Sequence, residues 1–154
     1  MDLGLRGRKA VITGSSKGLG QAIAETLASE GVDVHLVARD AKALERIATD
    51  LAKRHGVEAA FSALDLSDSA NVDRLFAQLS GPIDILVNNA GAIPGGSIDL
   101  IDETRWREAW DLKVFGYITS NGNVFLAIEA LATSARCFFF RFPSMCAPSS
   151  PLYT

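Results

Sequence analysis

Three glycines stand in the segment with the clearest chemical meaning, Thr13-Gly14-Ser15-Ser16-Lys17-Gly18-Leu19-Gly20, between a short apolar run and an amphipathic pattern. Gly14 permits a tight turn, Gly18 removes a side chain where a diphosphate would approach, and Gly20 allows a helix to pack closely on a strand. The N-terminus of a helix placed here would offer N–H groups to phosphates. The segment therefore predicts a phosphate-binding turn, the alternative being a glycine-rich turn without a ligand.

Two further polar segments follow predicted strands. Asp65-Leu66 comes after one of them, and Asn88-Asn89-Ala90-Gly91 comes directly after the next. Alone, these are compatible with a solvated loop carboxylate and an ordinary turn. The glycine spacing, Gly-x-x-x-Gly-x-Gly, also differs from the Gly-x-Gly-x-x-Gly fingerprint and lacks a P-loop ending. Together, however, the three segments lie at the carboxyl ends of predicted strands, where open α/β sheets bind ligands.

The strands and helices that must position these segments alternate along the chain. Apolar runs predict strands over residues 9–13, 32–38, 57–63 and 83–87. Helical stripes lie between them, the first carried by Leu19, Ile23 and Leu27 and the others by residues 44–51, 72–79 and 106–117. Gly31 and Gly56 are predicted to end the first two helices, and Ser67 is predicted to cap the third. Repeated βαβ units predict an α/β fold with a parallel sheet and helices on both faces.

The set Thr13-Gly14-x-x-x-Gly18-x-Gly20, Asp65 and Asn88-Asn89-Ala90-Gly91 resembles the classical short-chain dehydrogenase/reductase family over roughly residues 5–120. The resemblance implies a Rossmann-type doubly wound parallel sheet, incomplete with about four to five strands. It also implies hydride transfer between NAD(P)(H) and a small-molecule carbonyl or alcohol. Asp65 would contact the adenine. The implied cofactor contacts are Gly14, Ser15, Ser16, Lys17, Gly18, Leu19, Gly20, Arg39, Asp65, Leu66, Asn89, Ala90 and Gly91.

Charge at the end of the second predicted strand favours NADP(H) over NAD(H). An enzyme that prefers NAD usually presents a carboxylate there to the ribose 2′-hydroxyl. Ala38 occupies that position, Arg39 follows it, and Lys17 adds a second cation from the glycine segment. Two converging cations suit a 2′-phosphate. The alternatives are that both cations are solvated surface residues, or that Asp40 supplies the carboxylate.

The acid/base pair of the family has no counterpart in these 154 residues, because no lysine follows Lys113 and no Tyr-x-x-x-Lys occurs. A tyrosine of ordinary pKa needs a nearby cation to act near neutrality. Lys113 stands where the family has an asparagine, either as a helix-surface lysine or as a replacement in the site. Ser144 would take the family's serine position if residues 137–142 form a fifth strand. We therefore expect weak or no turnover, with a non-catalytic NADP(H)-binding fragment as the alternative.

The composition changes near the C-terminus. Glu129 is the last acidic residue, and residues 134–154 hold both cysteines and three of the five prolines. We therefore predict a dinucleotide-binding domain over residues 1–120 and a divergent tail over 121–154, frame-shifted or fused. A sheet that ends so early would leave apolar surface exposed, which predicts marginal stability or aggregation. A homo-oligomer is expected for a complete homologue. The aromatic residues of the fourth helix would join its interface or, alternatively, its core.

The charge balance excludes several other classes of function. The chain has 154 residues with 15 basic and 18 acidic side chains, a net charge of −3 and a pI of about 5.3. This lacks the basic field that nucleic-acid binding needs. The longest apolar runs are too short for a membrane span, and the first residues show no signal core. The two cysteines and two histidines predict no metal site, so a cytoplasmic protein is expected.

Overall fold

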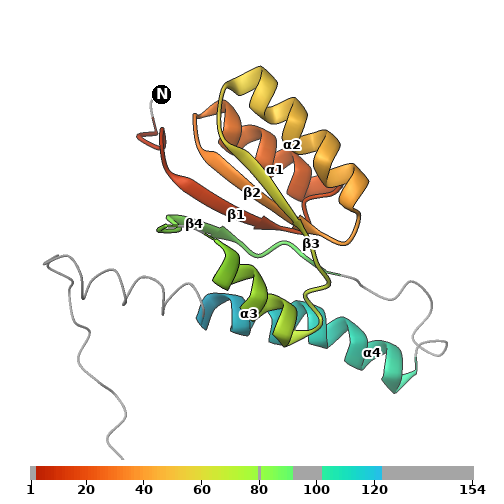
Figure 1. Ribbon diagram of the computed structural model, residues 1–154. Coiled ribbons are helices and arrows are strands. Elements are labelled where there is room, and N and C mark those ends of the chain that lie inside the picture. Colours follow the sequence, from red (N-terminus) through yellow and green to blue (C-terminus); the bar gives the residue numbers. More distant parts are fainter. Residues whose placement is uncertain (1–2, 80, 92–101, 123–154) are drawn as a thin grey trace, which may run out of the picture.

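The computed structural model describes residues 3–79, 81–91 and 102–122. Strands and helices alternate through this region, as Figure 1 shows. They are β1 (Lys9–Thr13), α1 (Gly18–Ser29), β2 (Asp33–Ala38), α2 (Ala41–His55), β3 (Ala59–Ala63), α3 (Ser69–Gln78), β4 (Ile85–Val87), α4 (Glu103–Trp110) and the π-helical turn η2 (Asp111–Phe115). The four predicted strands are therefore all present, three of them one or two residues shorter at the start than predicted.

The four strands form one parallel sheet in the order β3-β2-β1-β4. Val11 in the central strand β1 lies between His35 of β2 and Leu86 of β4 in the register. Helices α1 and α2 cover one face of the sheet, and α3 and α4 lie on the other (Figure 1). This confirms the predicted doubly wound α/β architecture, and it brings the carboxyl ends of all four strands to one edge.

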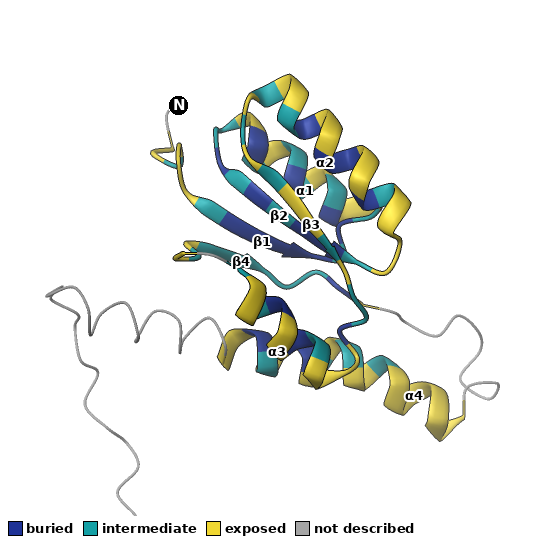
Figure 2. Ribbon diagram, in the orientation of Figure 1, coloured by how far each residue is buried: buried dark blue, intermediate teal, exposed yellow. Residues whose placement is uncertain are grey.

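The sheet is buried most deeply at its centre. Figure 2 shows β1 and β2 largely buried between the two helical layers. Ala10 and Ile12 of β1 belong to the core beneath α1 and α2, whereas Val11 belongs to the core on the α3 side. Each face of β1 therefore packs against an apolar layer, which explains why its sequence is a continuous apolar run rather than an alternating one.

Side-chain caps set the starts of the helices. The Asp40 carboxylate accepts a hydrogen bond from Ala43 N at 3.1 Å at the start of α2, and Gly56 ends that helix with φ +67°. The prediction that Ser67 caps the third helix is wrong. Asp68 caps α3 by accepting from Ala70 N at 2.9 Å, while Ser67 lies in the preceding loop. Gly31, with φ +80°, follows α1 as predicted.

The last described helix changes its winding part-way. Residues 103–110 are α-helical, 111–115 form the π-turn η2, and 116–122 are helical again. The α4 segment has no buried residue, as Figure 2 shows, and Trp106 and Trp110 are 42% and 54% exposed. These two aromatic side chains therefore do not join the core of the described chain. Among the described residues, no helix is long and apolar enough to cross a lipid bilayer.

Candidate functional site

A cleft of about 680 Å³ opens at the carboxyl edge of the sheet. This volume falls within the range typical of small-molecule and cofactor sites. All four strand ends and the turn η2 contribute to it. The lining residues are Gly14, Ser16, Lys17, Gly18, Val37, Ala38, Arg39, Asp40, Leu64, Asp65, Leu66, Asn89, Ala90, Gly91 and Leu112. Ten of the thirteen predicted cofactor contacts are in this set, and the exceptions are Ser15, Leu19 and Gly20.

The glycine turn between β1 and α1 leaves no space for side chains at two of its glycines. Gly14 has φ +67°, and a Cβ atom there would lie 2.8 Å from the backbone Cα of Ala90. A Cβ atom on Gly20 would overlap both the carbonyl oxygen of Gly14 and the side-chain amide nitrogen, Nδ2, of Asn89. Gly18 has φ +59° and faces open space. Gly14 and Gly20 thus allow the helix, the turn and the end of β4 to approach closely, as predicted for Gly20.

The N-terminal end of α1 has features that favour the binding of an anion. Lys17 is the N-cap residue, but its side chain makes no capping hydrogen bond, and the first turn of α1 contains no acidic residue. Among the described residues, no side chain accepts a hydrogen bond from the first N–H groups of the helix. The positive end of the helix dipole lies at Gly18, which lines the cleft. This arrangement suits a phosphate group.

Two hydroxyl residues hold the glycine turn in place. Thr13 is 1% exposed, and its Oγ1 accepts hydrogen bonds from Asn89 N at 2.9 Å and Ala90 N at 3.0 Å. Ser15 is fully buried, and its Oγ accepts from Val37 N at 3.0 Å. The Ser15 side chain is therefore used to join the turn to β2. The sequence predicts Ser15 as a cofactor contact, and it predicts no structural role for the Thr13 hydroxyl.

Asn89 completes the connection between β4 and the glycine turn. Its side-chain Nδ2 donates to the carbonyl oxygens of Thr13 and Gly14, both at 3.1 Å. Leu19 is 69% exposed and lies outside the cleft lining. All thirteen predicted contacts with a cofactor stay predictions, and Ser15, Leu19 and Gly20 lie outside the cleft lining.

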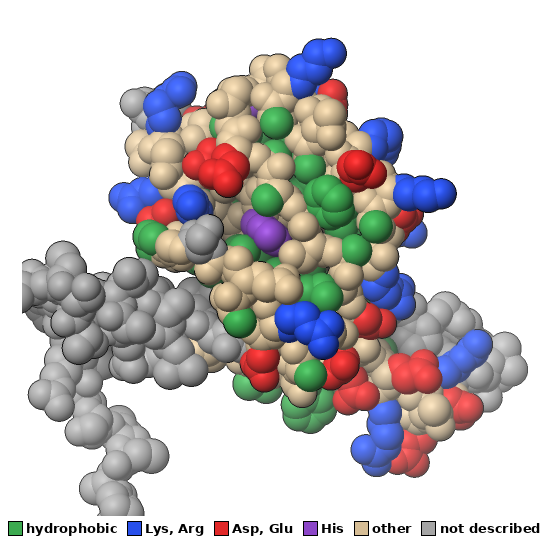
Figure 3. Space-filling view, in the orientation of Figure 1, with side chains coloured by type: hydrophobic (Ala, Val, Ile, Leu, Met, Phe, Trp, Pro, Cys, Tyr) green, Lys and Arg blue, Asp and Glu red, His purple; other side chains and the backbone are tan. Residues whose placement is uncertain are grey.

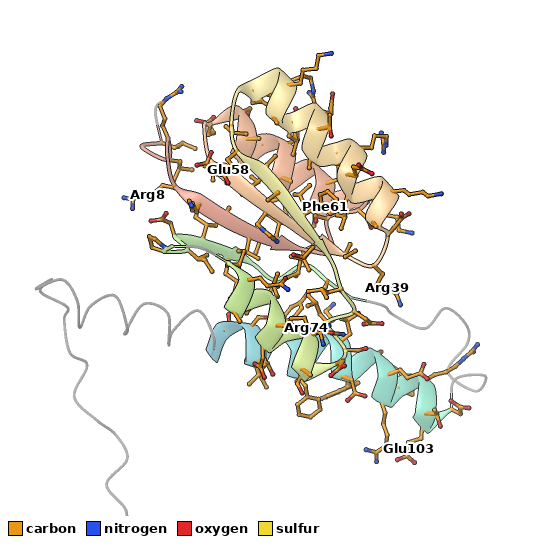
Figure 4. The ribbon with its side chains drawn as sticks, in the orientation of Figure 1. Arg8, Arg39, Glu58, Phe61, Arg74 and Glu103 are labelled. Atoms are coloured by element: carbon orange, nitrogen blue, oxygen red, sulfur yellow. The ribbon has the colours of Figure 1, made fainter. Side chains whose placement is uncertain are left out.

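Opposite charges meet at the β2–β3 side of the cleft. Arg39 Nη1 lies 3.9 Å from Asp65 Oδ2, and the Arg39 side chain is 72% exposed. Figure 4 shows Arg39 at the carboxyl edge of the sheet. Asp65 Oδ1 accepts from Ser67 N at 3.0 Å and from Ser67 Oγ at 2.8 Å. These hydrogen bonds from Ser67, and then the nearby Arg39 charge, hold the pKa of Asp65 below its ordinary value.

The last described helix is fitted closely against the cleft. A Cβ atom on Gly116 would lie 2.9 Å from the carbonyl oxygen of Leu66, so the helix backbone contacts the β3–α3 loop directly. One turn earlier, Leu112 lines the cleft and packs on the core at the α3 side. Asn121 Oδ1 accepts from Asn88 Nδ2 at 3.1 Å. Sequence periodicity did not identify Leu112, because the predicted apolar stripe followed Trp106 and Trp110, which are exposed.

Comparison with known proteins identifies the family of this chain. The model of the short chain dehydrogenase family matches residues 8–130. The chain belongs to the short-chain dehydrogenase family. It is 35% identical over 124 residues to 2,3-dihydro-2,3-dihydroxybenzoate dehydrogenase of Bacillus subtilis, an alignment that covers 79% of this chain and 47% of that protein. The predicted family is confirmed.

Two solved structures show the same fold. L-sorbose reductase from Gluconobacter frateurii, complexed with NADPH and L-sorbose, aligns with a TM-score of 0.80 and 36% identity over 86% of this chain and 51% of that one. RhlG of Pseudomonas aeruginosa, in an NADP active-site complex, aligns with a TM-score of 0.74 and 34% identity over 82% and 50%. The chain spans about half the length of these relatives.

Lys113 and Ser144 are the two remaining residues that the sequence predicts for the site of this short-chain dehydrogenase. Lys113 lies in η2, and its Cδ lies 3.7 Å from the position that a Cβ atom of Gly91 would take. It thus lies at the β4 side of the cleft. Ser144 and the predicted tail fall outside the described residues, apart from Asn121 and Gly122, which are helical.

Proposed function

We propose that this chain provides the cofactor site of an NADP(H)-dependent oxidoreductase that transfers hydride to or from a small-molecule carbonyl or alcohol. The cleft at the carboxyl edge carries the proposal, because it combines the glycine turn, an uncapped helix start and the Asn89 connection in one space. When bound, the nicotinamide ring would donate or accept the hydride. We extend the proposal to a cytoplasmic location, as expected from the sequence.

The roles of the residues in this proposal follow from their places in the cleft. The turn from Gly14 to Gly18, with the N–H groups at the start of α1, would hold the diphosphate. Asp65 and Leu66 would lie beside the adenine at the β3 end. Asn89, Ala90 and Gly91 would face the other half of the cofactor at the β4 end.

A preference for NADP(H) is the finer part of the proposal. Lys17 and Arg39 both line the cleft, where a 2′-phosphate would need positive charge. Asp40 lines it too, but its carboxylate is engaged with Ala43 N as the cap of α2. This engagement weakens the alternative in which Asp40 binds the ribose hydroxyls of NAD(H). Arg39 would leave its long ion pair with Asp65 for the stronger charge of the phosphate.

Titration of the full chain with NADPH and NADH tests the preference. We expect tighter binding of NADPH, and Arg39→Glu and Lys17→Glu should each weaken NADPH binding by about tenfold while changing NADH binding much less. The exposed Lys53, in the last turn of α2, offers a matched charge-reversal control, Lys53→Glu. Tighter binding of NADH than of NADPH to the unaltered chain would overturn the assignment.

The second candidate function is NADP(H) binding without turnover. These 154 residues contain no Tyr-x-x-x-Lys, and the family's asparagine position holds Lys113. We therefore propose that this chain consumes little or no NADPH with carbonyl substrates. Carbonyl reduction that is lost in Lys17→Glu and Arg39→Glu would contradict it, and a catalytic chain would be the conclusion.

The last described helix carries an exposed apolar face that is suited to self-association. Phe115 and Ile118 are 59% and 62% exposed and continue the face begun by Trp106 and Trp110. We propose that this face joins a homo-oligomer, because an apolar surface of this kind is costly to leave in water. Light scattering of the chain should then show a species larger than a monomer, and Trp110→Glu should convert it to the monomer.

A further inference from the structure

Lys113 is held beside the cleft by contacts of its own helix. Gly116 packs against the Leu66 carbonyl, and Leu112 lines the cleft itself. Lys113 lies between these two positions, and the aliphatic stem of its side chain runs beside Gly91. The side chain of Lys113 is not part of the cleft lining itself. Its ammonium group, two bonds beyond Cδ, lies within a few ångströms of Gly91, which lines the β4 end of the cleft.

No described neighbour neutralises the charge on this side chain. Among the residues that the structure describes, Lys113 has no hydrogen bond and no ion pair. By contrast, Arg107 on the same helix pairs with Glu103, and Arg54 on α2 pairs with Glu25 and Asp50. Within the described part of the chain, no acidic side chain therefore competes with a ligand for the charge of Lys113.

The order of the strands indicates which part of a dinucleotide this charge would meet. In open sheets of this type the diphosphate sits at the first helix N-terminus, and the adenosine ribose lies at the end of the second strand. Here those places are the Gly14–Gly18 turn and Arg39 on β2, and β3 lies beyond β2. The remaining side of the cleft, formed by Asn89, Ala90, Gly91 and Leu112, is left for the nicotinamide half.

We propose that Lys113 makes the site discriminate between the two redox forms of the cofactor, binding NADPH in preference to NADP⁺. The oxidised nicotinamide ring carries a positive charge and the reduced ring is neutral, so a lysine ammonium at this end repels only the oxidised form. The side chain is exposed, and solvent screens the repulsion. The effect on the ratio of the two dissociation constants is therefore about two- to fivefold. This inference rests on the proposed function.

Calorimetric titration of the full chain with NADP⁺, NADPH and 2′,5′-ADP tests the inference without turnover. In Lys113→Gln the ratio of the NADP⁺ to the NADPH dissociation constant should fall about two- to fivefold. Binding of 2′,5′-ADP, which has no nicotinamide, should stay unchanged. Lys113→Arg should keep the original ratio because it keeps the charge, and Lys53→Gln, at the far end of α2, should keep it as well.

The possible results distinguish a failure of this inference from a failure of the proposed function. An unchanged ratio in Lys113→Gln, with all three ligands still bound, would overturn the role of Lys113 and leave the proposed NADP(H) site intact. Equal weakening of all three ligands would also overturn it, since that result indicates a disturbed fold. Failure of all three ligands to bind the unaltered chain would overturn the proposed function and this inference with it.

Discussion

Asn89 donates two hydrogen bonds to Thr13 across 76 positions of the chain: its backbone N donates to the Thr13 hydroxyl oxygen at 2.9 Å, and its side-chain Nδ2 donates to the Thr13 carbonyl oxygen at 3.1 Å. Thr13 Oγ1 also donates to the carbonyl oxygen of Val87 at 3.2 Å. These bonds join the end of β1 to the end of β4, so the two glycine-bearing segments form one wall of the cleft. Stability and cofactor binding should consequently depend on the same few atoms.

Replacing Thr13 by Val should destabilise the fold. The substitution keeps the shape of the side chain but removes the acceptor for two N–H groups, those of Asn89 and the buried Ala90. An unsatisfied buried donor costs about 1–3 kcal/mol, so the free energy of unfolding should fall by about that amount. Urea unfolding followed by circular dichroism measures the change.

Thr13→Ser is the matched control, because it keeps the hydroxyl and removes one methyl group. It should recover most of the stability lost in Thr13→Val. If the two variants unfold at the same urea concentration, the hydroxyl bonds contribute little, and the methyl group of Thr13 would be the part that matters.

Gly20→Ala should disturb both folding and the cleft. Its new methyl group would overlap the Gly14 carbonyl and the Asn89 amide, which are backbone and hydrogen-bonded groups that cannot move away freely. Overpacking of this kind typically costs about 1–3 kcal/mol of unfolding free energy. Thermal unfolding should show a lower midpoint, and NADPH titration should show weaker binding.

Gly122→Ala provides the comparison for this variant, because it also lies in a helix and a Cβ atom there meets nothing within 4 Å. It should leave the midpoint unchanged or raise it slightly, since alanine favours helices. A midpoint for Gly20→Ala equal to that of Gly122→Ala would show that the helix can shift away from the turn.

The main parts of the fold and cleft could be predicted because they depend on local patterns. Buried strands are short apolar runs, and glycines are needed where backbones approach closely, as at Gly14 and Gly20. The segment that includes Asn89 could be placed at the same edge because parallel strands share the direction of their carboxyl ends. These predictions depend only on residues that are neighbours in the sequence and on the order of the strands. They do not depend on how side chains pack.

Details that depend on competition between similar residues could not be predicted. Ser67, Asp68 and Ser69 are all good capping residues, and Asp68 takes the cap while Ser67 donates both of its groups to Asp65. Likewise, the helical stripe that includes Trp110 assumes uninterrupted α-helical periodicity. The π-turn over residues 111–115 interrupts that periodicity, and Leu112 lines the cleft while Trp110 is 54% exposed.

A carboxylate at the end of β2 should reverse the cofactor preference. Ala38 is the last residue of β2 and lines the cleft, beside Arg39. In Ala38→Asp the new carboxylate would repel a 2′-phosphate and accept a hydrogen bond from the ribose 2′-hydroxyl of NADH. The ratio of NADPH to NADH affinity should fall by about tenfold, which corresponds to about 1.4 kcal/mol. Fluorescence titration with both cofactors measures the ratio.

Ala38→Asn adds a side chain of nearly the same size without the charge, and it should change the ratio far less. The same fall in both variants would mean that crowding at this position, rather than charge, governs the choice of cofactor.

Stability should decrease as the pH falls from about 7 to 5 because of His35. Burial lowers the pKa of His35 below its ordinary value of 6.5, so the folded protein holds the ring neutral. The unfolded chain takes up the proton first, near pH 6.5, and stability that is complete above this value is lost as the pH falls toward the folded pKa. Glu25, Asp65 and Asp84, whose pKa values are also lowered, contribute losses only at more acidic pH.

Urea unfolding at several pH values separates these contributions. His35→Gln should flatten the dependence between pH 7 and 5 and leave the more acidic loss in place. Ser62→Ala removes the hydroxyl that lies 2.9 Å from His35 Nε2, yet it should keep the dependence, because burial and not this hydrogen bond lowers the pKa. A pH dependence that survives in His35→Gln would assign the acid sensitivity to another group, and one that disappears in Ser62→Ala would assign it to the hydrogen bond.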